Sequence, residues 1–211
     1  MSKTIIIDTG TSNIKSIANA ISYLNFDYEI INKFKKLDDA SCIILPGVGS
    51  FDQVMRFIKT KELDKSLEKA VLENKIPLLG ICIGMQILFT KSDEGKEEGL
   101  NFLTGQIKKL KFSNNSKYKV PNTGFREVVF NNNNPLVNQQ KKIAHLYFNH
   151  SYALMCKDIS FIHDQSVHNN EFVASFNFNN IYGMQFHPEK SQKFGLYLIK
   201  NFIELANGVQ K

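Results

Sequence analysis

A single cysteine between two glycines is the first candidate for chemistry in this chain. The stretch Gly80-Ile81-Cys82-Ile83-Gly84 continues an apolar run that begins at Pro77, and a helix-like stretch follows it. A strand that turns sharply into a helix presents the residue at the turn as a nucleophile, and flanking glycines permit that turn. The dipole of the following helix stabilises a thiolate, the reactive form of cysteine. The sequence therefore predicts a nucleophilic Cys82, with a buried structural cysteine as the alternative.

A histidine and a glutamate further along the chain could complete such a site. His187, Pro188 and Glu189 follow the last predicted strand. Pro188 fixes the backbone, so that Glu189 can turn back toward the imidazole. A nucleophile, a base and a carboxylate that orients the base form a catalytic triad, whatever their order in the sequence. A histidine at a strand end is most often structural, but its pairing with the cysteine turn favours a catalytic role for His187.

A glycine-rich turn supplies a third element of the predicted site. Gly47, Val48 and Gly49 follow the apolar run 42–45, and open α/β sheets bind their ligands at the carboxyl ends of such strands. Glycines allow backbone N–H groups to face a developing oxyanion, in company with the N–H of Ile83. The turn is weak evidence alone and gains weight because it falls in the same sheet as Cys82.

Apolar runs and helical periodicities alternate over the first 90 residues and predict a parallel sheet. The expected strands are 4–8, 28–31, 42–45 and 77–81, and the expected helices are 14–24, 52–58 and 63–72. Ser12 or Asn13 could cap the first helix. Right-handed crossovers between these strands would cover both faces of the sheet with helices.

The second half of the chain has shorter, β-like runs. These are expected at 106–110, 125–130, 144–149, 172–176 and 181–186. Asn179-Asn180 is a plausible hairpin turn between the last two, and the asparagine tract 131–135 reads as a surface loop. A final helix is expected over 192–206, before the stop signal Gly208. The predicted fold class is thus α/β, a mixed and mostly parallel sheet with helices on both faces.

Composition indicates one soluble domain over residues 1–211. That length suits a single core, and no apolar run approaches the roughly 18 residues of a membrane span. We expect a cytoplasmic protein that binds no membrane. The net charge of +6 comes from lysines, with Arg56 and Arg126 the only arginines, so nucleic-acid binding is not expected. Three widely spaced cysteines fit neither a disulfide framework nor a metal site, and no metal is expected.

Five stretches of the sequence together resemble the class I glutamine amidotransferases. They are IIIDTGTSNIKSI, LPGVGSF, GICIGMQILF, YFNHSYAL and YGMQFHPEKSQKFGLYLIKNF, and they extend over nearly the whole chain. Within that class the chain is similar to the glutaminase subunits of imidazole glycerol phosphate synthase. The resemblance implies a flavodoxin-like fold, L-glutamine as substrate and no cofactor. It implies that Cys82 forms a γ-glutamyl thioester, that His187 transfers protons and that Glu189 holds His187.

The resemblance also implies which residues bind the substrate. Gln86 and Glu94, one and three helical turns beyond the nucleophile, would bind the amino-acid end of glutamine. Ser151 and Tyr152 would offer backbone contacts to its carboxylate.

A partner is implied as well, because free ammonia is useful only if a second protein receives it. In the resembled family this partner is a (β/α)8-barrel cyclase subunit, which would form a heterodimer with this chain. Asn13, Tyr147 and Lys190 match positions near that interface. A peptide flip in the turn 47–49 could complete the oxyanion hole when the partner is loaded.

The match to the family departs in two places. The family usually reads P-H-M-G-W-N where this chain has Pro121-Asn122-Thr123-Gly124-Phe125-Arg126, and Asn149 replaces an apolar residue. These departures bear on which barrel is docked more than on glutamine cleavage. Two alternatives stay open: a paralogue that supplies ammonia for amidination of a bacterial surface sugar, and a catalytically silent docking subunit.

Overall fold

A nine-stranded mixed sheet organises the molecule. The computed structural model describes residues 3–11, 13–111, 119–137, 142–156, 163–166 and 172–208. The strand order is β2-β1-β3-β4-β12-β11-β10-β7-β8. Five of these strands are joined by parallel pairs: β2 (Tyr28–Ile31), β1 (Lys3–Ile7), β3 (Ala40–Gly47), β4 (Leu78–Cys82) and β12 (Ile181–Met184). Antiparallel pairs then add β11 (Val173–Phe178), β10 (His163–Ser166), β7 (Asn122–Val129) and β8 (Ile143–His150). The predicted mixed sheet is confirmed.

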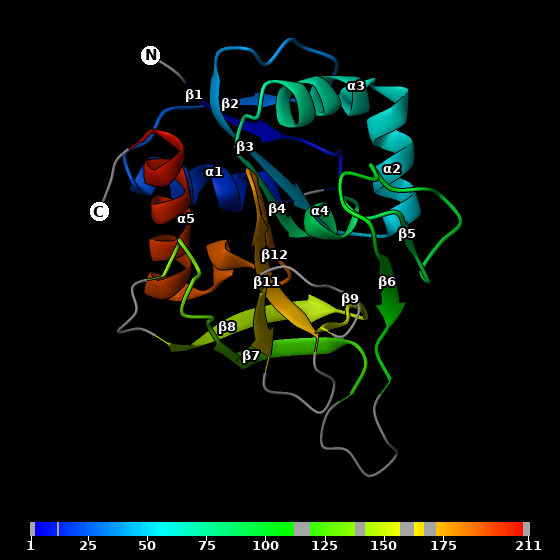
Figure 1. Cartoon of the computed structure of the whole chain (residues 1–211), viewed down its shortest axis with the longest axis vertical. Helices are drawn as coiled ribbons and strands as arrows, with labels where there is room; N and C mark the ends of the chain where they lie inside the picture. Colours follow the sequence, from blue (N-terminus) through cyan, green and yellow to red (C-terminus); the bar gives the residue numbers. More distant parts are fainter. Residues whose placement is uncertain are drawn as a thin grey trace.

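Helices cover both faces of this sheet, as the sequence predicted. In Figure 1, α1 (Ile14–Tyr23) and α5 (Gln192–Ala206) lie on one side, and α2 (Phe51–Thr60) and α3 (Leu63–Glu68) lie on the other. A π-helical turn, η1 (Lys69–Glu73), extends α3. Helix α1 buries Ile17, Ala18 and Ile21, the apolar positions that repeat at helical spacing. Asn13 occupies its N-cap without a side-chain capping hydrogen bond, and Ser12 lies outside the described residues.

A small second sheet lies beside the first. It contains β5 (Lys91–Ser92), β6 (Gln106–Lys109) and β9 (Tyr152–Leu154). The sequence did not predict β5, β9 or β10. β5 and β9 are two and three residues long, too short for alternation to be visible. The sequence of β10 is His-Asp-Gln-Ser, which lacks the β-branched and aromatic residues that strands favour.

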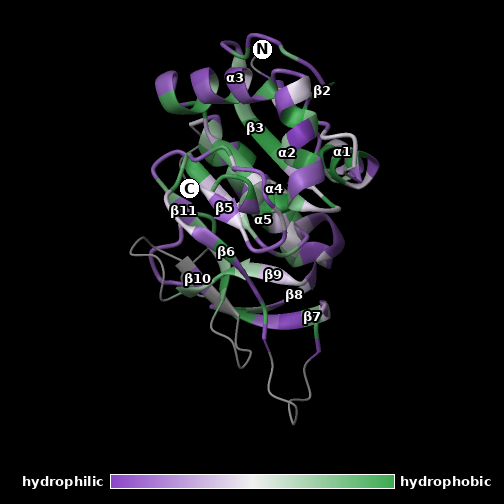
Figure 2. Ribbon diagram, turned by 90° about the vertical axis from the view of Figure 1, so that its right-hand side faces the viewer, coloured by the Kyte–Doolittle hydropathy of each residue, from purple (hydrophilic) through white to green (hydrophobic). Residues whose placement is uncertain are grey.

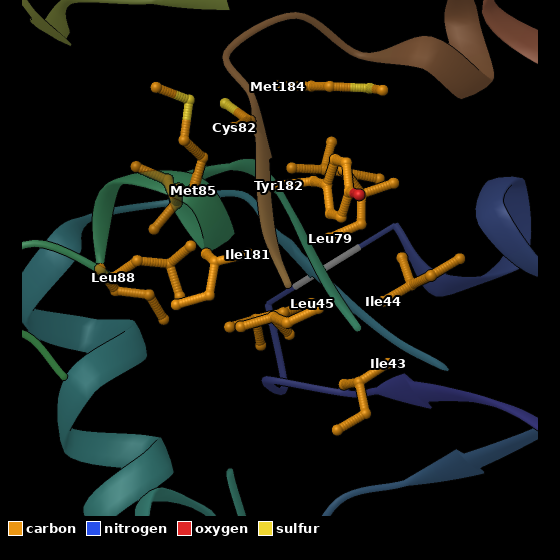
Figure 3. Close-up of a cluster of buried hydrophobic side chains, with 14 of the residues drawn as sticks. Ile43, Ile44, Leu45, Leu79, Cys82, Met85, Leu88, Ile181, Tyr182 and Met184 are labelled. Carbon is orange, nitrogen blue, oxygen red and sulfur yellow. The ribbon is translucent and has the colours of Figure 1, made fainter. Parts of the chain in front are cut away.

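The core lies where the central strands meet the helices. Figure 3 shows buried side chains of β3, β4 and β12, among them Ile43, Leu79 and Ile181, gathered below the turn that carries Cys82. The central strands are nearly continuous apolar runs because helices cover both of their faces. In Figure 2 the central strand β3 is largely green, while the ribbons of α2 and α3 carry much purple. None of the helices in the described ranges combines the length and the apolar character needed to cross a membrane.

Candidate active site

The backbone turn at Cys82 is strained, and its neighbouring glycines provide space. β4 ends at Cys82, which has φ 55° and ψ −112°, and α4 (Ile83–Gln86) begins immediately after it. Non-glycine residues in such regions cost about 1–3 kcal/mol and cluster at active sites. A Cβ on Gly84 would lie 1.7 Å from the Leu45 carbonyl oxygen, and one on Gly80 would lie 2.7 Å from the Gly84 carbonyl oxygen. The sequence argument assigned the sharp turn to the glycines. The positive φ belongs instead to Cys82, and the glycines allow β3, β4 and α4 to approach closely.

His187 lies near the cysteine because it follows β12, the strand next to β4 in the sheet. β12 pairs with β4 in parallel, so both chain segments leave the sheet at the same edge. The His187 amide donates to the Tyr147 carbonyl (2.8 Å), and the 3₁₀ turn η3 (Pro188–Lys190) follows. That turn brings Glu189 Oε1 to 2.9 Å from His187 Nδ1, and both side chains are buried.

The electrostatic surroundings favour a protonated His187. Burial by itself lowers the pKa of the imidazole, but hydrogen bonds and charge interactions with Cys82 and Glu189 outweigh it and raise the pKa of His187 to about 10. The imidazole is therefore positively charged at neutral pH.

In the part of the chain that the structure describes, no cluster of three or more His, Cys, Asp or Glu side chains could hold a metal ion.

A cavity of about 190 Å³ lies in front of the cysteine. It brings together most of the residues singled out from the sequence: Val48, Gly49, Cys82, Ile83, Gln86, Glu94, Ser151, Tyr152 and His187. Glu189 is not in its lining and contacts His187 instead. Gly47 also lies outside it, opposite Cys82 in the β3–β4 register, where a Cβ would lie 2.8 Å from the Gly84 nitrogen.

Glu94 reaches the cavity by a different route from the one expected. The sequence placed it three helical turns beyond the nucleophile, but α4 ends at Gln86 and Glu94 follows β5 in a loop. The chain folds back here instead of continuing the helix, and the amide of Leu100 donates to the Ile87 carbonyl (2.7 Å). Glu94 Oε2 accepts a hydrogen bond from the amide of Phe51 (2.8 Å). Burial raises the pKa of this carboxyl group.

Several residues near the thiol were not predicted from the sequence to belong to the site. Pro121, Asn149 and His150 also line the cavity. Gln185 places Nε2 at 3.8 Å from Cys82 Sγ, and its own Oε1 accepts from Gln86 Nε2 (3.0 Å). Their signal in one sequence is weak, because these are ordinary residue types at strand ends and in loops.

Two of the residues expected at a partner interface, Tyr147 and Lys190, lie beside His187 and Glu189 but outside the cavity. Lys190 Nζ lies 5.7 Å from the centre of the Tyr147 ring, and that ring packs edge-on against Phe125 with centroids 5.6 Å apart. Phe125 is 43% exposed. Asn13 begins α1, which contacts the turn η3 that carries Lys190.

Comparisons with known proteins agree with this geometry. Residues 5–205 match the family model "Glutamine amidotransferase class-I". The chain is 43% identical to "Imidazole glycerol phosphate synthase subunit HisH 2" of Methanococcus maripaludis over 95% of this chain and 98% of that protein. It is 38% identical to "Imidazole glycerol phosphate synthase subunit HisH" of Leptospira borgpetersenii, with the same coverage.

Solved structures share the fold at low sequence identity. A putative GMP synthase protein from Thermoplasma acidophilum superposes with a TM-score of 0.74 at 21% identity, over 99% of this chain and 95% of that one. PurLQS from Thermotoga maritima gives 0.73 at 18% identity, over 97% and 98%. The match over nearly the whole chain, together with the curated relatives, shows that this chain belongs to the class I glutamine amidotransferase family and, within it, to the HisH subunits of imidazole glycerol phosphate synthase.

Proposed function

We propose that this chain is the glutaminase subunit of an imidazole glycerol phosphate synthase and that it forms a single domain. It hydrolyses L-glutamine and passes the ammonia to a (β/α)8-barrel partner. The observation that carries the proposal is the cavity, in which a strained cysteine and a charged histidine face the same small space as Gln86 and Glu94. The volume of this cavity, about 190 Å³, is smaller than the roughly 300–1,000 Å³ of pockets that bind drug-sized ligands. A cavity of this size suits a single amino acid.

The chemistry follows from the triad. Cys82 Sγ attacks the side-chain carboxamide carbon of glutamine, and His187 gives its proton to the departing nitrogen, so that ammonia leaves and a thioester remains. His187 then takes a proton from water, which attacks the thioester and releases glutamate. Glu189 holds the imidazole through Nδ1, which leaves Nε2 for these transfers. The N–H groups of Ile83 and of the turn Gly47–Gly49 would stabilise the oxyanion.

The amino-acid end of glutamine finds complementary groups on the cavity wall. Gln86 Oε1 is buried and has no hydrogen-bond partner, although an unpaired buried acceptor costs about 1–3 kcal/mol. An α-ammonium group would supply the missing donor, and the Glu94 carboxylate would supply the opposite charge. Backbone groups of Ser151 and Tyr152 would contact the α-carboxylate.

The partner face is proposed beside the triad. Tyr147, Lys190 and Asn13 would contact the barrel, and the exposed ring of Phe125, which packs on Tyr147, extends this surface. Aromatic residues are enriched in the cores of interfaces. The product ammonia would leave His187 toward this face, and the barrel would use it to form imidazole glycerol phosphate and the aminoimidazole carboxamide nucleotide.

The test is glutamate release from glutamine by the full chain, alone and with a histidine-pathway barrel subunit and its nucleotide ligand. We expect the loaded barrel to stimulate glutamate release strongly, and we expect Cys82→Ala to release no glutamate with or without the barrel. Cys156→Ala is the matched control, because Cys156 is also a buried cysteine but lies outside the cavity. Alkylation of Cys82 by a glutamine analogue without stimulation by the barrel would keep the glutaminase and reject the histidine-pathway partner. Absence of both would reject the proposed function.

A further inference from the structure

A chain of hydrogen bonds connects strand β7 to the wall of the cavity. Arg126 Nε donates to Asn122 Oδ1 (2.9 Å), and Asn122 Nδ2 lies 3.0 Å from His150 Nε2. On the other side of the ring, His150 Nδ1 lies 2.9 Å from the Tyr152 carbonyl oxygen. That carbonyl also accepts from Gln86 Nε2 (2.9 Å). The chain therefore ends on two residues of the proposed glutamine site.

The direction of these bonds is set at both ends of the chain. Arginine has donors and no acceptor, so Asn122 must turn its oxygen toward Arg126 and its NH₂ group toward His150. His150 Nε2 must then accept, and the single proton of the neutral ring must be on Nδ1. The Tyr152 carbonyl, which can only accept, selects the same tautomer from the other side of the ring. Without Arg126 the Asn122 amide could flip, and its oxygen would then favour a proton on Nε2 in opposition to that carbonyl.

The surroundings make this orientation consequential. Asn122 and His150 are 2% and 6% exposed, so a reversed amide would leave buried polar groups unpaired, which is unfavourable. Burial lowers the pKa of His150 to about 4, so the ring is neutral and has a defined tautomer. Arg126 itself is held in place because Nη1 and Nη2 donate to the Phe125 and Thr123 carbonyls (2.9 and 2.8 Å).

We propose that Arg126 and Asn122 are positioning residues that fix the tautomer of His150 and, through the Tyr152 carbonyl, the wall against which glutamine binds. This inference rests on the proposed function of the cavity. It concerns substrate binding rather than bond cleavage, because the chain reaches Gln86 and Tyr152 and not the proton path of His187.

The first measurement is the tautomer of His150 in the resting protein, read from the ¹⁵N shifts of its two ring nitrogens and assigned with a His150→Gln sample. We expect the proton on Nδ1 in the wild type and a detectable fraction protonated on Nε2 in Arg126→Met and Asn122→Leu, where the Tyr152 carbonyl alone still selects Nδ1. Arg126→Lys keeps the charge without the planar fork. Its fraction of His150 protonated on Nδ1 should lie between those of the wild type and Arg126→Met. Lys200→Met, which removes an exposed cation on α5, should match the wild type.

The second measurement is the rate of alkylation of Cys82 by 6-diazo-5-oxo-L-norleucine, separated into an inhibitor constant and a maximal rate. We expect Arg126→Met and Asn122→Leu to raise the inhibitor constant about three- to tenfold, since one net hydrogen bond is worth about 0.5–1.5 kcal/mol. The maximal rate should stay within about twofold, because Cys82 and His187 are untouched. If one variant does not fold, the other carries the test.

Two results would overturn the positioning role: a wild-type tautomer in both variants, or an altered tautomer with an unchanged inhibitor constant. A failure of the proposed function is recognised separately. In that case the wild type itself would resist alkylation, while the tautomer comparison would still report whether Arg126 orients His150.

Discussion

Asp52 holds the loop that carries Glu94, although it is outside the cavity. Its carboxylate accepts from the amides of Lys96 (2.9 and 3.1 Å) and Glu97 (2.9 Å). These bonds, first that of Glu97 and then that of Lys96, lower the pKa of Asp52. Asp52 belongs to the first turn of α2, whose first amide donates to Glu94. We therefore predict that Asp52→Ala releases the loop from the helix and takes Glu94 away from the cavity.

The size of the effect can be worked from these bonds. Hydrogen bonds to a charged group are worth about 1.5–3 kcal/mol each, and the Asp52 side chain is 20% exposed, so water will replace part of what is lost. We take about 2–3 kcal/mol for both bonds together, which corresponds to about 30- to 150-fold in the opening equilibrium of the loop.

The assay is hydrogen exchange at the Phe51 amide. This amide donates its hydrogen bond to Glu94 and not to the Asp52 carboxylate. If the loop leaves the helix in Asp52→Ala, this amide loses its acceptor and should exchange about 30- to 150-fold faster after correction for intrinsic rates. Glu94→Ala removes the acceptor of this amide altogether and therefore gives the upper limit of its exchange rate. Lys59→Met is the matched control, since it removes an exposed ion pair to Glu97 and leaves both Asp52 bonds. Unchanged protection of Phe51 in Asp52→Ala would refute the reasoning.

Three further variants test other parts of the structure. Gly84→Ala places a methyl group against the Leu45 carbonyl oxygen and should lower the free energy of unfolding in urea by about 1–3 kcal/mol or more. Phe148→Ala empties a fully buried site in the core and should cost about 3–5 kcal/mol in the same assay. The pKa of His187 is raised from 6.5 to about 10, so its contribution to stability is complete below pH 6.5 and is lost as the pH rises toward 10. Unfolding free energies measured over that range should fall in the wild type and fall less steeply in Glu189→Gln.

Most of the fold could be predicted because its strongest signals are local. The strands predicted at residues 4–8, 42–45 and 77–81 are largely buried on both faces, and burial of that kind leaves an apolar run in the sequence. The strand 28–31 lies at the edge of the sheet and is only partly buried. Helix α5 was predicted with its bounds because its apolar spacing is helical and Gly208 ends it with φ 73°. These features depend on neighbouring residues alone.

The missed features depend on contacts between distant parts of the chain. Glu94 was placed on a helix because spacing from Cys82 is all that one sequence offers, whereas its position depends on Asp52 and Phe51, more than 40 residues earlier. The chain from Arg126 to Tyr152 joins three strands, β7, β8 and β9, through side chains and one main-chain carbonyl. Polar pairings of this kind leave no periodic pattern, so the segment 121–126 could be noted as unusual but its contacts could not be predicted.

The backbone of Cys82 sets stability against reactivity. A residue held at φ 55° and ψ −112° makes the folded state less stable by about 1–3 kcal/mol, and glycine would relieve part of that cost. Cys82→Gly should therefore give a protein that is inert but melts at a higher temperature. Stability alone would favour glycine at this position, so the strained cysteine is a cost that the proposed turnover of glutamine would explain and that a docking subunit would not need.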